Sequence, residues 1–589
     1  MTQSVSQLLL RLWCHINPRR RVQLAMLLIL MILTSFAEII SIGTVLPFLA
    51  ILTDPNRIFM HPVAQPFIHL LGITDSKQLL LPLTVTFGLA ALVVGAMRLL
   101  LLWASTRLSY AAGADLSISI YRRTLYQPYA VHVARNSSEI ITGIANKTDR
   151  AIYIINMTLY LMSSIVMLIA ILIALIYVDP VIAVSALGGF GLIYALIIQV
   201  TRKRLLVNSK TVARESTYVI KSLQEGLGGI RDVLIDGSQA TFCQIYRNAD
   251  QPLRLAQGNS TFISSSPRYG MEALGMLLIS ILAYTISQED DRISMAIPIL
   301  GAIALGAQRM LPILQQAFMA WSTLQGGQIS LRDILELLDQ QLPAHADQPI
   351  TPQLPFNENI SLDQVSFRYS EQTPWVLKNL DLKLTKGSCT GFIGATGSGK
   401  STLLDIVMGL LQPTNGSIKI DYRPVTANNQ RAWQRHIAHV PQTIYLSDST
   451  IEENIAFGLP KEQIDQERVR QAAIHAQIAE VIDSWPKKYQ TVVGERGIRL
   501  SGGQRQRIGI ARALYKQADV LIFDEATSAL DNETESAVMQ AIEGLSKELT
   551  LLIIAHRLTT LKNCNQIVEL GNCEILRVGT YSEIVSQSD

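Results

Sequence analysis

Residues 1–321 contain six apolar segments, each long enough to cross a lipid bilayer. A spanning helix needs about 20 predominantly apolar residues. Only 16% of the 589 residues are charged, whereas soluble globular proteins have about 25%. The chain is therefore predicted to be a membrane protein with six spanning helices. They are expected at residues 22–52, 79–112, 153–178, 181–200, 263–287 and 293–321.

Basic residues alternate along the connections between these segments. Arg19, Arg20 and Arg21 precede the first segment, and the second and fourth connections are long and rich in arginine and lysine. The third connection is only Asp179-Pro180, and the fifth, near residues 289–292, is mainly acidic. Basic loops remain in the cytoplasm. Both termini and both long connections are thus predicted to be cytoplasmic, in a multi-pass protein of the plasma (inner) membrane.

The composition changes near residue 322, where the chain becomes polar and proline-containing. From about residue 358 onward, short β-rich runs alternate with helical stretches, the pattern of a soluble α/β domain. We expect a transmembrane domain at residues 1–325 with two long cytoplasmic extensions, a linker at 326–357 and an α/β domain at 358–589. The net formal charge of +3 gives no reason to expect a nucleic-acid partner.

The α/β domain begins with a complete phosphate-binding loop. Glycines let backbone N–H groups approach phosphate oxygens, the lysine reaches the β- and γ-phosphates, and the following serine binds Mg²⁺. An apolar run precedes the loop and a helical pattern follows it, as this motif requires. The residues assigned to phosphate binding are Gly394, Ala395, Thr396, Gly397, Ser398, Gly399, Lys400, Ser401 and Thr402.

Residues 500–504 read Leu-Ser-Gly-Gly-Gln. This pentapeptide, together with the phosphate-binding loop, resembles the ATP-binding cassette (ABC) family, in which two cassettes clamp ATP between them. The resemblance implies ATP and Mg²⁺ as cofactors. It also implies a fold: a six-helix transmembrane ABC exporter domain followed by an α/β P-loop ATPase cassette with a helical subdomain.

The resemblance implies roles for five further residues of the cassette. Tyr369 matches the aromatic residue that stacks on adenine. Gln442 matches the glutamine that contacts Mg²⁺, and Asp524 matches the aspartate that holds the metal through water. Glu525 matches the general base that polarises the attacking water, and His556 matches the switch histidine that contacts the γ-phosphate. Because no consensus catalytic residue is absent, a degenerate regulatory or channel-like relative is disfavoured.

The same resemblance predicts a homodimer with two composite ATP sites, unless a different partner chain supplies the other half. In this family one cassette's signature motif meets the phosphate-binding loop of the other cassette, so one chain cannot complete a site alone. The segment 528–531 resembles the D-loop, and 494–497 resembles the exporter segment that contacts the membrane domain. The signature residues expected to face the partner's ATP are Ser501, Gly502, Gly503 and Gln504.

Three arginines lie within the predicted spans: Arg98, Arg268 and Arg309. Insertion scales give about 2.5–3.5 kcal/mol for an arginine at the bilayer centre, so these side chains are expected to face a polar substrate cavity. Structural pairing is the alternative. Glu272 lies four residues after Arg268 on the same helical face, and Glu38 in the first span is a candidate partner for Arg98.

Several segments of the membrane half resemble the PglK-type flippases of bacterial lipid-linked oligosaccharides. They include residues 126–139, 223–232, 267–272 and 308–312. The resemblance implies that the cavity arginines attract the pyrophosphate of a lipid-linked, anionic glycan, with membrane lipid as a second partner. The outer loop at residues 54–77 resembles the external helix of such flippases, although a plain surface helix is an equal alternative.

Other cargoes remain open from the residues alone. An exporter of peptides, lipids or hydrophobic drugs would share the cassette but should tolerate loss of the three arginines better. A peptide exporter that matures its cargo would need an N-terminal protease domain, and only some 20 residues precede the first span. A soluble DNA-repair ATPase is excluded by the six spans.

Overall fold

The computed structural model describes residues 3–53, 59, 65, 73–136, 141, 143–144, 146–178, 180–287, 293–343, 346, 353–525, 530–544, 549–555 and 557–585. The chain divides into two compact units. One comprises residues 1–127 and 135–342, and the other residues 128–134 and 343–589. The division after residue 342 falls inside the segment that was expected to be a linker.

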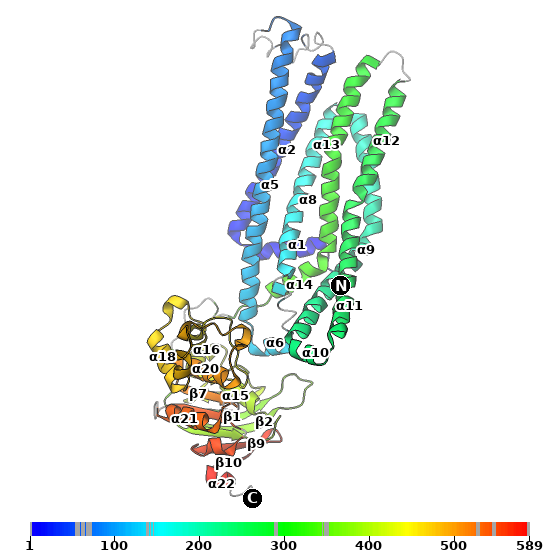
Figure 1. Ribbon diagram of the computed structural model, residues 1–589. Coiled ribbons are helices and arrows are strands. Elements are labelled where there is room, and N and C mark those ends of the chain that lie inside the picture. The colour runs from blue at the N-terminus through cyan, green and yellow to red at the C-terminus, as the bar shows by residue number, and fades with distance from the viewer. Residues whose placement is uncertain are drawn as a thin grey trace. The chain divides into compact units, whose positions relative to one another are not determined.

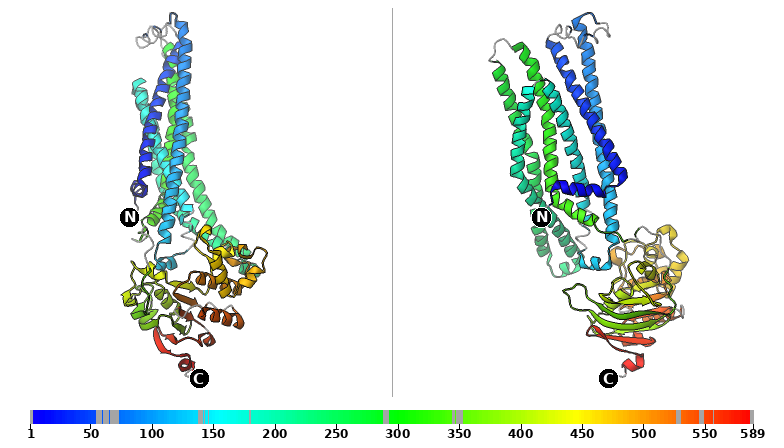
Figure 2. Two further views of the ribbon diagram at one scale, coloured as in Figure 1. Left: turned by 90° about the vertical axis from the view of Figure 1, so that its left-hand side faces the viewer. Right: turned by 180° about the vertical axis from the view of Figure 1, so that it is seen from behind.

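Long helices make up the first unit (Figures 1 and 2). They cover all six predicted spans, and α9 and α11 extend well beyond them. The helices of this unit are α1 (Val5–His15), α2 (Pro18–Thr53), α5 (Leu80–Leu125), α8 (Asn146–Val178), α9 (Pro180–Gly228), α10 (Ile230–Ile235), α11 (Gln239–Ser265), α12 (Pro267–Ser287), α13 (Ile293–Gly326) and α14 (Gln328–Leu338), with the 3₁₀ turn η1 (Ser76–Leu79).

Within the described residues, three helical stretches are long and apolar enough to cross a membrane: Pro18–Ser41, Leu80–Leu125 and Thr148–Ile173. Large apolar side chains on α2, α5 and α8 are exposed, including Phe36, Leu92 and Ile173. Such an outward-facing apolar surface is expected where helices meet lipid. Most of the outer loop at residues 54–77 lies outside the described residues, so its predicted helix cannot be compared with the structure.

Two helices beside the spans add to the core of the first unit. The amphipathic α1 buries Leu8 and Leu12, and α14 buries Leu331, Ile334 and Leu335, in one cluster with α2, α5, α8 and α13. The segment expected to be a linker therefore begins with a packed helix. Its apolar side chains recur every three to four residues, a helical period that the surrounding polar residues obscured.

The cassette contains two sheets. Within its described residues, one sheet has the order β2-β1-β4-β5 and is antiparallel, and the other has the order β10-β9-β3-β8-β7-β6. In the second sheet all neighbours are parallel except β10, which runs antiparallel to β9. The strands are β1 (Asn359–Phe367), β2 (Leu377–Thr385), β3 (Cys389–Ile393), β4 (Asn415–Ile420), β5 (Arg423–Pro424), β6 (Ile437–Val440), β7 (Val520–Asp524), β8 (Thr550–Ile554), β9 (Gln566–Gly571) and β10 (Glu574–Gly579).

Helices pack with these sheets, and the helices between β6 and β7 form the helical subdomain. Gly509 on α20 packs so closely on Ile444 that an added Cβ would lie 2.5 Å from that side chain. The helices are α15 (Lys400–Val407), α16 (Gln430–Gln434), α17 (Ile451–Ile455), α18 (Gln466–His475), α19 (Ala479–Asp483), α20 (Gly502–Tyr515), α21 (Asn532–Glu543) and α22 (Tyr581–Val585), with 3₁₀ turns η3 (Lys461–Gln463), η4 (Lys488–Gln490), η5 (Glu495–Gly497) and η6 (Leu558–Leu561).

The parallel strands form the centre of the cassette because they are apolar on both faces. Every residue of β8 is buried, as are the first four residues of β7. Strands that are covered on both faces read as continuous apolar runs rather than as alternating patterns. This arrangement fixes the carboxyl ends of β3, β6, β7 and β8 at one edge of the sheet.

The short helix α6 (Tyr129–Ala134) groups with the cassette rather than with the long helices. It comes from the first of the two long connections that were predicted to be cytoplasmic. Burial raises the pKa of the Tyr129 hydroxyl, and the neighbouring Asp405 and Tyr369 add to the effect. Tyr129 therefore lies beside cassette residues close to the phosphate-binding loop.

Candidate ATP site and membrane cavities

The predicted ATP-site residues follow the carboxyl ends of the central parallel strands. The phosphate-binding loop follows β3, Gln442 follows β6, Asp524 ends β7, and Glu525 comes directly after it. Ligands of open α/β sheets bind at this edge. The fold therefore brings these segments together, although they are far apart in the sequence.

Backbone geometry at the phosphate-binding loop favours glycine at three positions. Gly394 has a φ of 142°, and a Cβ there would lie 2.1 Å from the carbonyl oxygen of Leu570. Gly399 has a φ of 97°, and a Cβ there would lie 2.7 Å from Leu377 and 2.9 Å from the carbonyl oxygen of Val376. Gly397 also has a positive φ, of 85°, but the space around it is open. The loop therefore packs closely against neighbouring residues at Gly394 and Gly399. It is open at Gly397, where phosphates would approach.

Polar groups of the loop are arranged to receive an anion. Lys400 Nζ donates to the carbonyl oxygens of Gly394 and Ala395, at 2.8 and 2.9 Å, so its side chain arches back over the loop. Ser398 is buried, and its hydroxyl has no hydrogen-bond partner among the described residues. The amino end of α15 adds the positive end of a helix dipole. This loop fits a triphosphate.

Two oxygen ligands suitable for Mg²⁺ lie side by side. Ser401 Oγ and Asp524 Oδ1 are 3.5 Å apart, and Mg²⁺ is typically held by one or two such groups together with substrate phosphates. Burial raises the pKa of Asp524, the Ser401 hydroxyl opposes this rise, and the Glu525 carboxylate adds to it. A cation would offset this concentration of negative charge, so the site also fits Mg²⁺.

Glu525 is held in an unusual backbone conformation. Its φ is 51°, in the left-handed region that non-glycine residues rarely adopt and that tends to persist at functional sites. The backbone N–H of Glu525 donates to the carbonyl of Ile554 at 3.1 Å. Gln442 Nε2 donates to Glu525 Oε2 at 2.5 Å. The structure therefore joins two of the three predicted catalytic residues directly.

Tyr369 lies beside the helix that follows the loop. Its hydroxyl is 3.2 Å from Thr402 Oγ1, its ring meets Phe367 edge-on at 5.0 Å, and the residue is 51% exposed. An exposed aromatic ring next to the loop is in a suitable position to stack on a base.

Asp405 also lies near the ATP site, which the sequence did not predict. This carboxyl group has a pKa of about 6 because it is buried and lies near Asp524. A signal was available, because Asp405 follows Ser401 by four residues and so shares its face of α15.

The signature motif forms the start of α20. The hydroxyl of Ser501 accepts from the N–H of Gln504 at 3.2 Å, and Gln504 Oε1 accepts from the N–H of Ser501 at 2.9 Å. This capping box leaves the amides of Gly502 and Gly503 at the amino end of a 14-residue helix. Backbone amides at such an end form an anion-binding surface.

Three predicted features cannot be placed from the structure. His556 and residues 528–529 of the D-loop lie outside the described residues. Arg309 belongs to α13, but its side chain also lies outside the described part of the chain.

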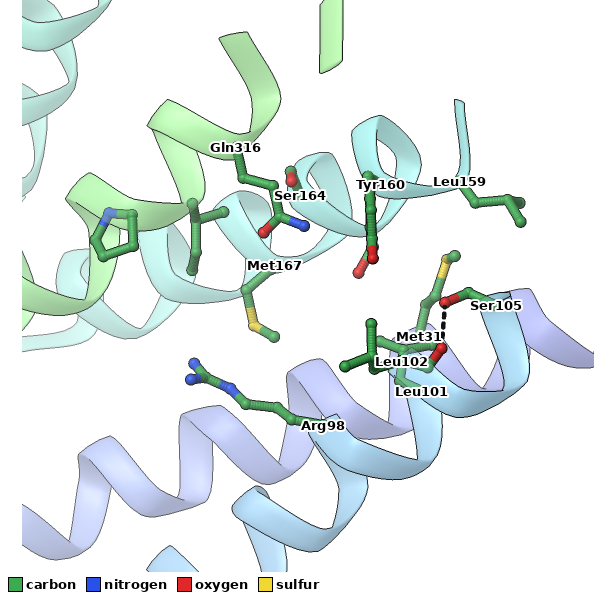
Figure 3. A pocket seen from close by; sticks show the side chains of 13 residues that line it. Met31, Arg98, Leu101, Leu102, Ser105, Leu159, Tyr160, Ser164, Met167 and Gln316 are labelled. Carbon is green, nitrogen blue, oxygen red and sulfur yellow. Dashed lines mark hydrogen bonds between the residues drawn. The ribbon is translucent and has the colours of Figure 1, made fainter. Parts of the chain in front are cut away.

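Arg98 lines a cavity of about 290 Å³ in the membrane unit, bounded by α2, α5, α8 and α13. Figure 3 shows its guanidinium extending from α5 on the side of the cavity opposite Met167 and Gln316. Arg98 also lies 2.9 Å from the carboxylate of Glu38, whose side chain is fully buried while that of Arg98 is 45% exposed. Arg98 therefore lines a cavity and also pairs with Glu38. The sequence had suggested both arrangements.

Arg268 lines a second cavity, of about 600 Å³, between α9, α11, α12 and α13. Its Nε donates to Glu272 Oε1 at 2.9 Å, which confirms the pairing expected from their four-residue spacing. Pro312 and Gln316 line both cavities, so the two spaces adjoin along α13.

Comparison with known proteins agrees with this architecture. The ABC transporter family matches residues 377–528, and the ABC transporter transmembrane region matches residues 24–301. The ATP-dependent lipid A-core flippase of Cupriavidus pinatubonensis is 30% identical over 487 residues, which cover 80% of each chain. The corresponding flippase of Alkalilimnicola ehrlichii is 31% identical over 405 residues, covering 68% of this chain and 67% of that protein. A solved structure of a bacterial Atm1-family ABC exporter with ATP bound shares the fold, with a TM-score of 0.79 at 22% identity, over 97% of this chain and 96% of that one.

The chain therefore belongs to the ABC transporter family. It is a multi-pass half-transporter of exporter architecture, in which one transmembrane region precedes one ATP-binding, ATP-hydrolysing cassette.

Proposed function

We propose that two copies of this chain use ATP hydrolysis to flip a lipid-linked, phosphate-bearing oligosaccharide across the plasma membrane. The observation that carries the proposal is the pair of adjoining cavities in the membrane unit, each of which is lined by one of the predicted arginines together with other polar and apolar side chains. A guanidinium group suits phosphate oxygens because its donors match them in pairs. Relatives named as lipid A-core flippases support an amphiphile with a polar head group as the cargo.

For the chemical step, we assign the general base to Glu525. Its carboxylate would orient a water molecule and accept its proton as the water attacks the γ-phosphorus, while Gln442 holds the carboxylate in place. Lys400 would neutralise charge on the β- and γ-phosphates, and Tyr369 would stack on adenine. Bound Mg²⁺, held by Ser401 and Asp524, would supply further charge neutralisation. His556 keeps its proposed contact with the γ-phosphate.

The composite site requires a second cassette, so we propose a homodimer. The amides at the start of α20 and the Ser501 hydroxyl would contact the γ-phosphate bound to the partner. Phosphoryl transfer depends mainly on positioning and charge stabilisation. Hydrolysis should therefore require closure of the dimer. The topology expected from the basic loops places both cassettes and all four termini in the cytoplasm.

A second candidate cargo is a free glycolipid of the lipid A type, which the names of the two relatives favour. Peptide or drug export is the remaining alternative. The cargoes differ in whether phosphate and sugar are joined to a polyprenyl chain, to an acylated sugar or to neither. The choice among them is therefore a question of head-group recognition in the cavities.

The test is ATPase activity of the protein in liposomes, screened against polyprenyl-pyrophosphate glycans, lipid A, peptides and hydrophobic dyes. We expect several-fold stimulation by the glycan lipid. The triple variant Arg98→Gln, Arg268→Gln, Arg309→Gln should lose this stimulation, and with Glu38→Gln added, so that no buried carboxylate is left without its counter-charge, it should retain basal activity. Stimulation by dyes or peptides that survives the triple substitution would contradict the proposal, and a response to lipid A alone would favour the second candidate.

A further inference from the structure

The cavity around Arg268 is built from four helices, with Ser264 and Ser265 contributed by the end of α11. Tyr194 comes from α9, Arg268, Tyr269 and Glu272 come from the start of α12, and Gln315 comes from α13. Its volume of about 600 Å³ lies within the range of small-molecule sites, about 300–1,000 Å³. The chemistry of its lining differs from what a phosphate site requires.

First, the described side chains of the lining carry no net formal charge. Arg268 is already neutralised by Glu272 at 2.9 Å, and these side chains are 61% and 39% exposed, so both ions face open space. An approaching phosphate would be attracted by the guanidinium and repelled by the carboxylate. A hydroxyl group, which both donates and accepts, can satisfy both members of the pair.

Second, two polar groups in the wall lack partners. Tyr194 is only 6% exposed, and neither its hydroxyl nor Gln315 Nε2 has a hydrogen-bond partner among the described residues. A buried polar group without a partner costs about 1–3 kcal/mol. The neighbouring hydroxyls of Ser264 and Ser322, by contrast, bond to each other at 2.7 Å. Both atoms are enclosed in the wall, so a neutral ligand with several hydroxyl or amide groups would supply the missing partners once these side chains rotate toward the cavity.

Third, aromatic rings accompany these polar groups. Tyr194 lies 5.5 Å from Phe318, and Phe318 lies 5.7 Å from Trp321, measured between ring centroids. Tyr269 lines the same cavity and is 71% exposed. Of the rings that line the cavity, Tyr269 is the exposed one, whereas Tyr194 and Phe318 are buried. An exposed tyrosine ring provides both an apolar face and a polar tip for hydrogen bonding. This combination fits the alternating C–H and O–H surfaces of a sugar ring.

We propose that this cavity is the sugar subsite of the transporter, and that Arg268 acts there as half of a neutral Arg268–Glu272 pair. Tyr194, Tyr269 and Gln315 complete the subsite. The inference rests on the proposed lipid-linked glycan cargo and refines the role of Arg268. In this cavity, hydrogen bonds from side chains with no net charge would recognise the glycan. The phosphate groups of the same lipid would bind at another place along the transport pathway.

The test compares two probes in nanodiscs containing the full-length protein. One is undecaprenyl pyrophosphate carrying an N-acetylhexosamine oligosaccharide, and the other is the same lipid without sugar. We expect the wild type to be stimulated at least about threefold more by the glycan lipid. Tyr194→Phe and Glu272→Gln should reduce this ratio to about one while the response to the bare lipid persists. Tyr194→Phe removes one hydroxyl and leaves the ring in place.

Matched controls separate recognition from folding. Glu336→Gln breaks a comparable pair, in which Arg332 Nε lies 3.0 Å from Glu336 Oε1 on α14, and Tyr218→Phe removes a hydroxyl from an exposed residue of α9. Both controls should keep the wild-type ratio. All variants are compared for basal ATPase activity and thermal unfolding.

The outcomes are distinguishable. If the wild type responds to neither lipid, the proposed cargo fails and the subsite assignment fails with it. If the wild type responds to both lipids equally, a lipid pyrophosphate remains supported as the cargo, but the assignment of the cavity as a sugar subsite is overturned. A glycan preference that persists in Tyr194→Phe and Glu272→Gln also overturns the subsite, whereas loss of the preference in these variants alone supports it.

Discussion

The ATP site and the membrane cavities use opposite strategies to handle charge. In the cassette, Lys400 Nζ donates to two carbonyls of its own phosphate-binding loop, and its charge opposes the rise that burial causes in the pKa of Asp524. In the membrane unit, the two predicted cavity arginines whose side chains are described, Arg98 and Arg268, each have a carboxylate at 2.9 Å. The cassette therefore keeps its charges available for a ligand, whereas the membrane unit balances them internally.

This difference follows from the surroundings of the two regions. The cassette edge is open to water, which solvates charged groups until a nucleotide arrives. A charge on a spanning helix has no such solvent, so an internal counter-ion lowers the cost of inserting it. Substrate recognition in the membrane unit is consequently expected to depend more on hydrogen bonding and shape than on net charge.

The largest effect, on ATP turnover, is expected from removing a charged side chain of the ATP site. Glu525→Gln keeps a group that can still contact Gln442 but cannot accept a proton. Steady-state ATP turnover should fall by about 100- to 10,000-fold, with nucleotide affinity retained. Phosphate release and fluorescent-nucleotide binding measure the two quantities. Glu533→Gln, on an exposed residue of α21, is the charge-matched control, and near-normal turnover in Glu525→Gln would remove Glu525 as the base.

An intermediate effect is expected where an internal charge pair is broken. Glu38 is fully buried and Arg98 is 45% exposed, so Arg98→Gln takes the counter-charge from a buried carboxylate. The free energy of unfolding should fall by an amount that approaches the 3–5 kcal/mol typical of a broken buried pair. The fall in Glu38→Gln should be smaller. Thermal unfolding in detergent measures both.

The double variant Arg98→Gln, Glu38→Gln should recover much of the loss, because neither charge then remains. The Arg332–Glu336 pair, at 50% and 57% exposure, provides a surface comparison worth about 0–1 kcal/mol. Additive single effects at Arg98 and Glu38 would show that the pair is not coupled.

The smallest effect is expected at Asp405. Its folded-state pKa of about 6 exceeds the ordinary value of 3.8. The folded state therefore binds more protons than the unfolded state between these pH values, and stability falls as pH rises through that window. Asp405→Asn should remove this cost and stabilise the nucleotide-free protein by up to about 3 kcal/mol at pH 7.5, because a pKa difference of one unit corresponds to about 1.4 kcal/mol.

At pH 5 the gain from Asp405→Asn should be roughly half as large, because part of the cost has already been relieved by proton binding. Thermal unfolding at the two pH values tests this, with the exposed Asp448→Asn as control. A gain that does not change with pH would indicate that altered packing, rather than charge, is responsible.

The sequence predicted the two regions to different degrees for a physical reason. Backbone-bound phosphates need particular residues in a fixed order, so the loop from Gly394 to Ser401 could be recognised without a structure. The spans were also predictable, because bilayer thickness sets their length. Local spacing was enough to predict Arg268–Glu272. The cavity of Tyr194, Arg268 and Gln315 could not be predicted, because it depends on how four helices pack.

Pro312 has a mechanical consequence for the two adjoining cavities. Proline has no N–H, so the carbonyl four residues earlier in α13 loses its usual helical partner and the helix axis can bend there. A bend at this point would move Gln316 relative to both spaces at once. The shapes of the two compartments are therefore coupled through one helix.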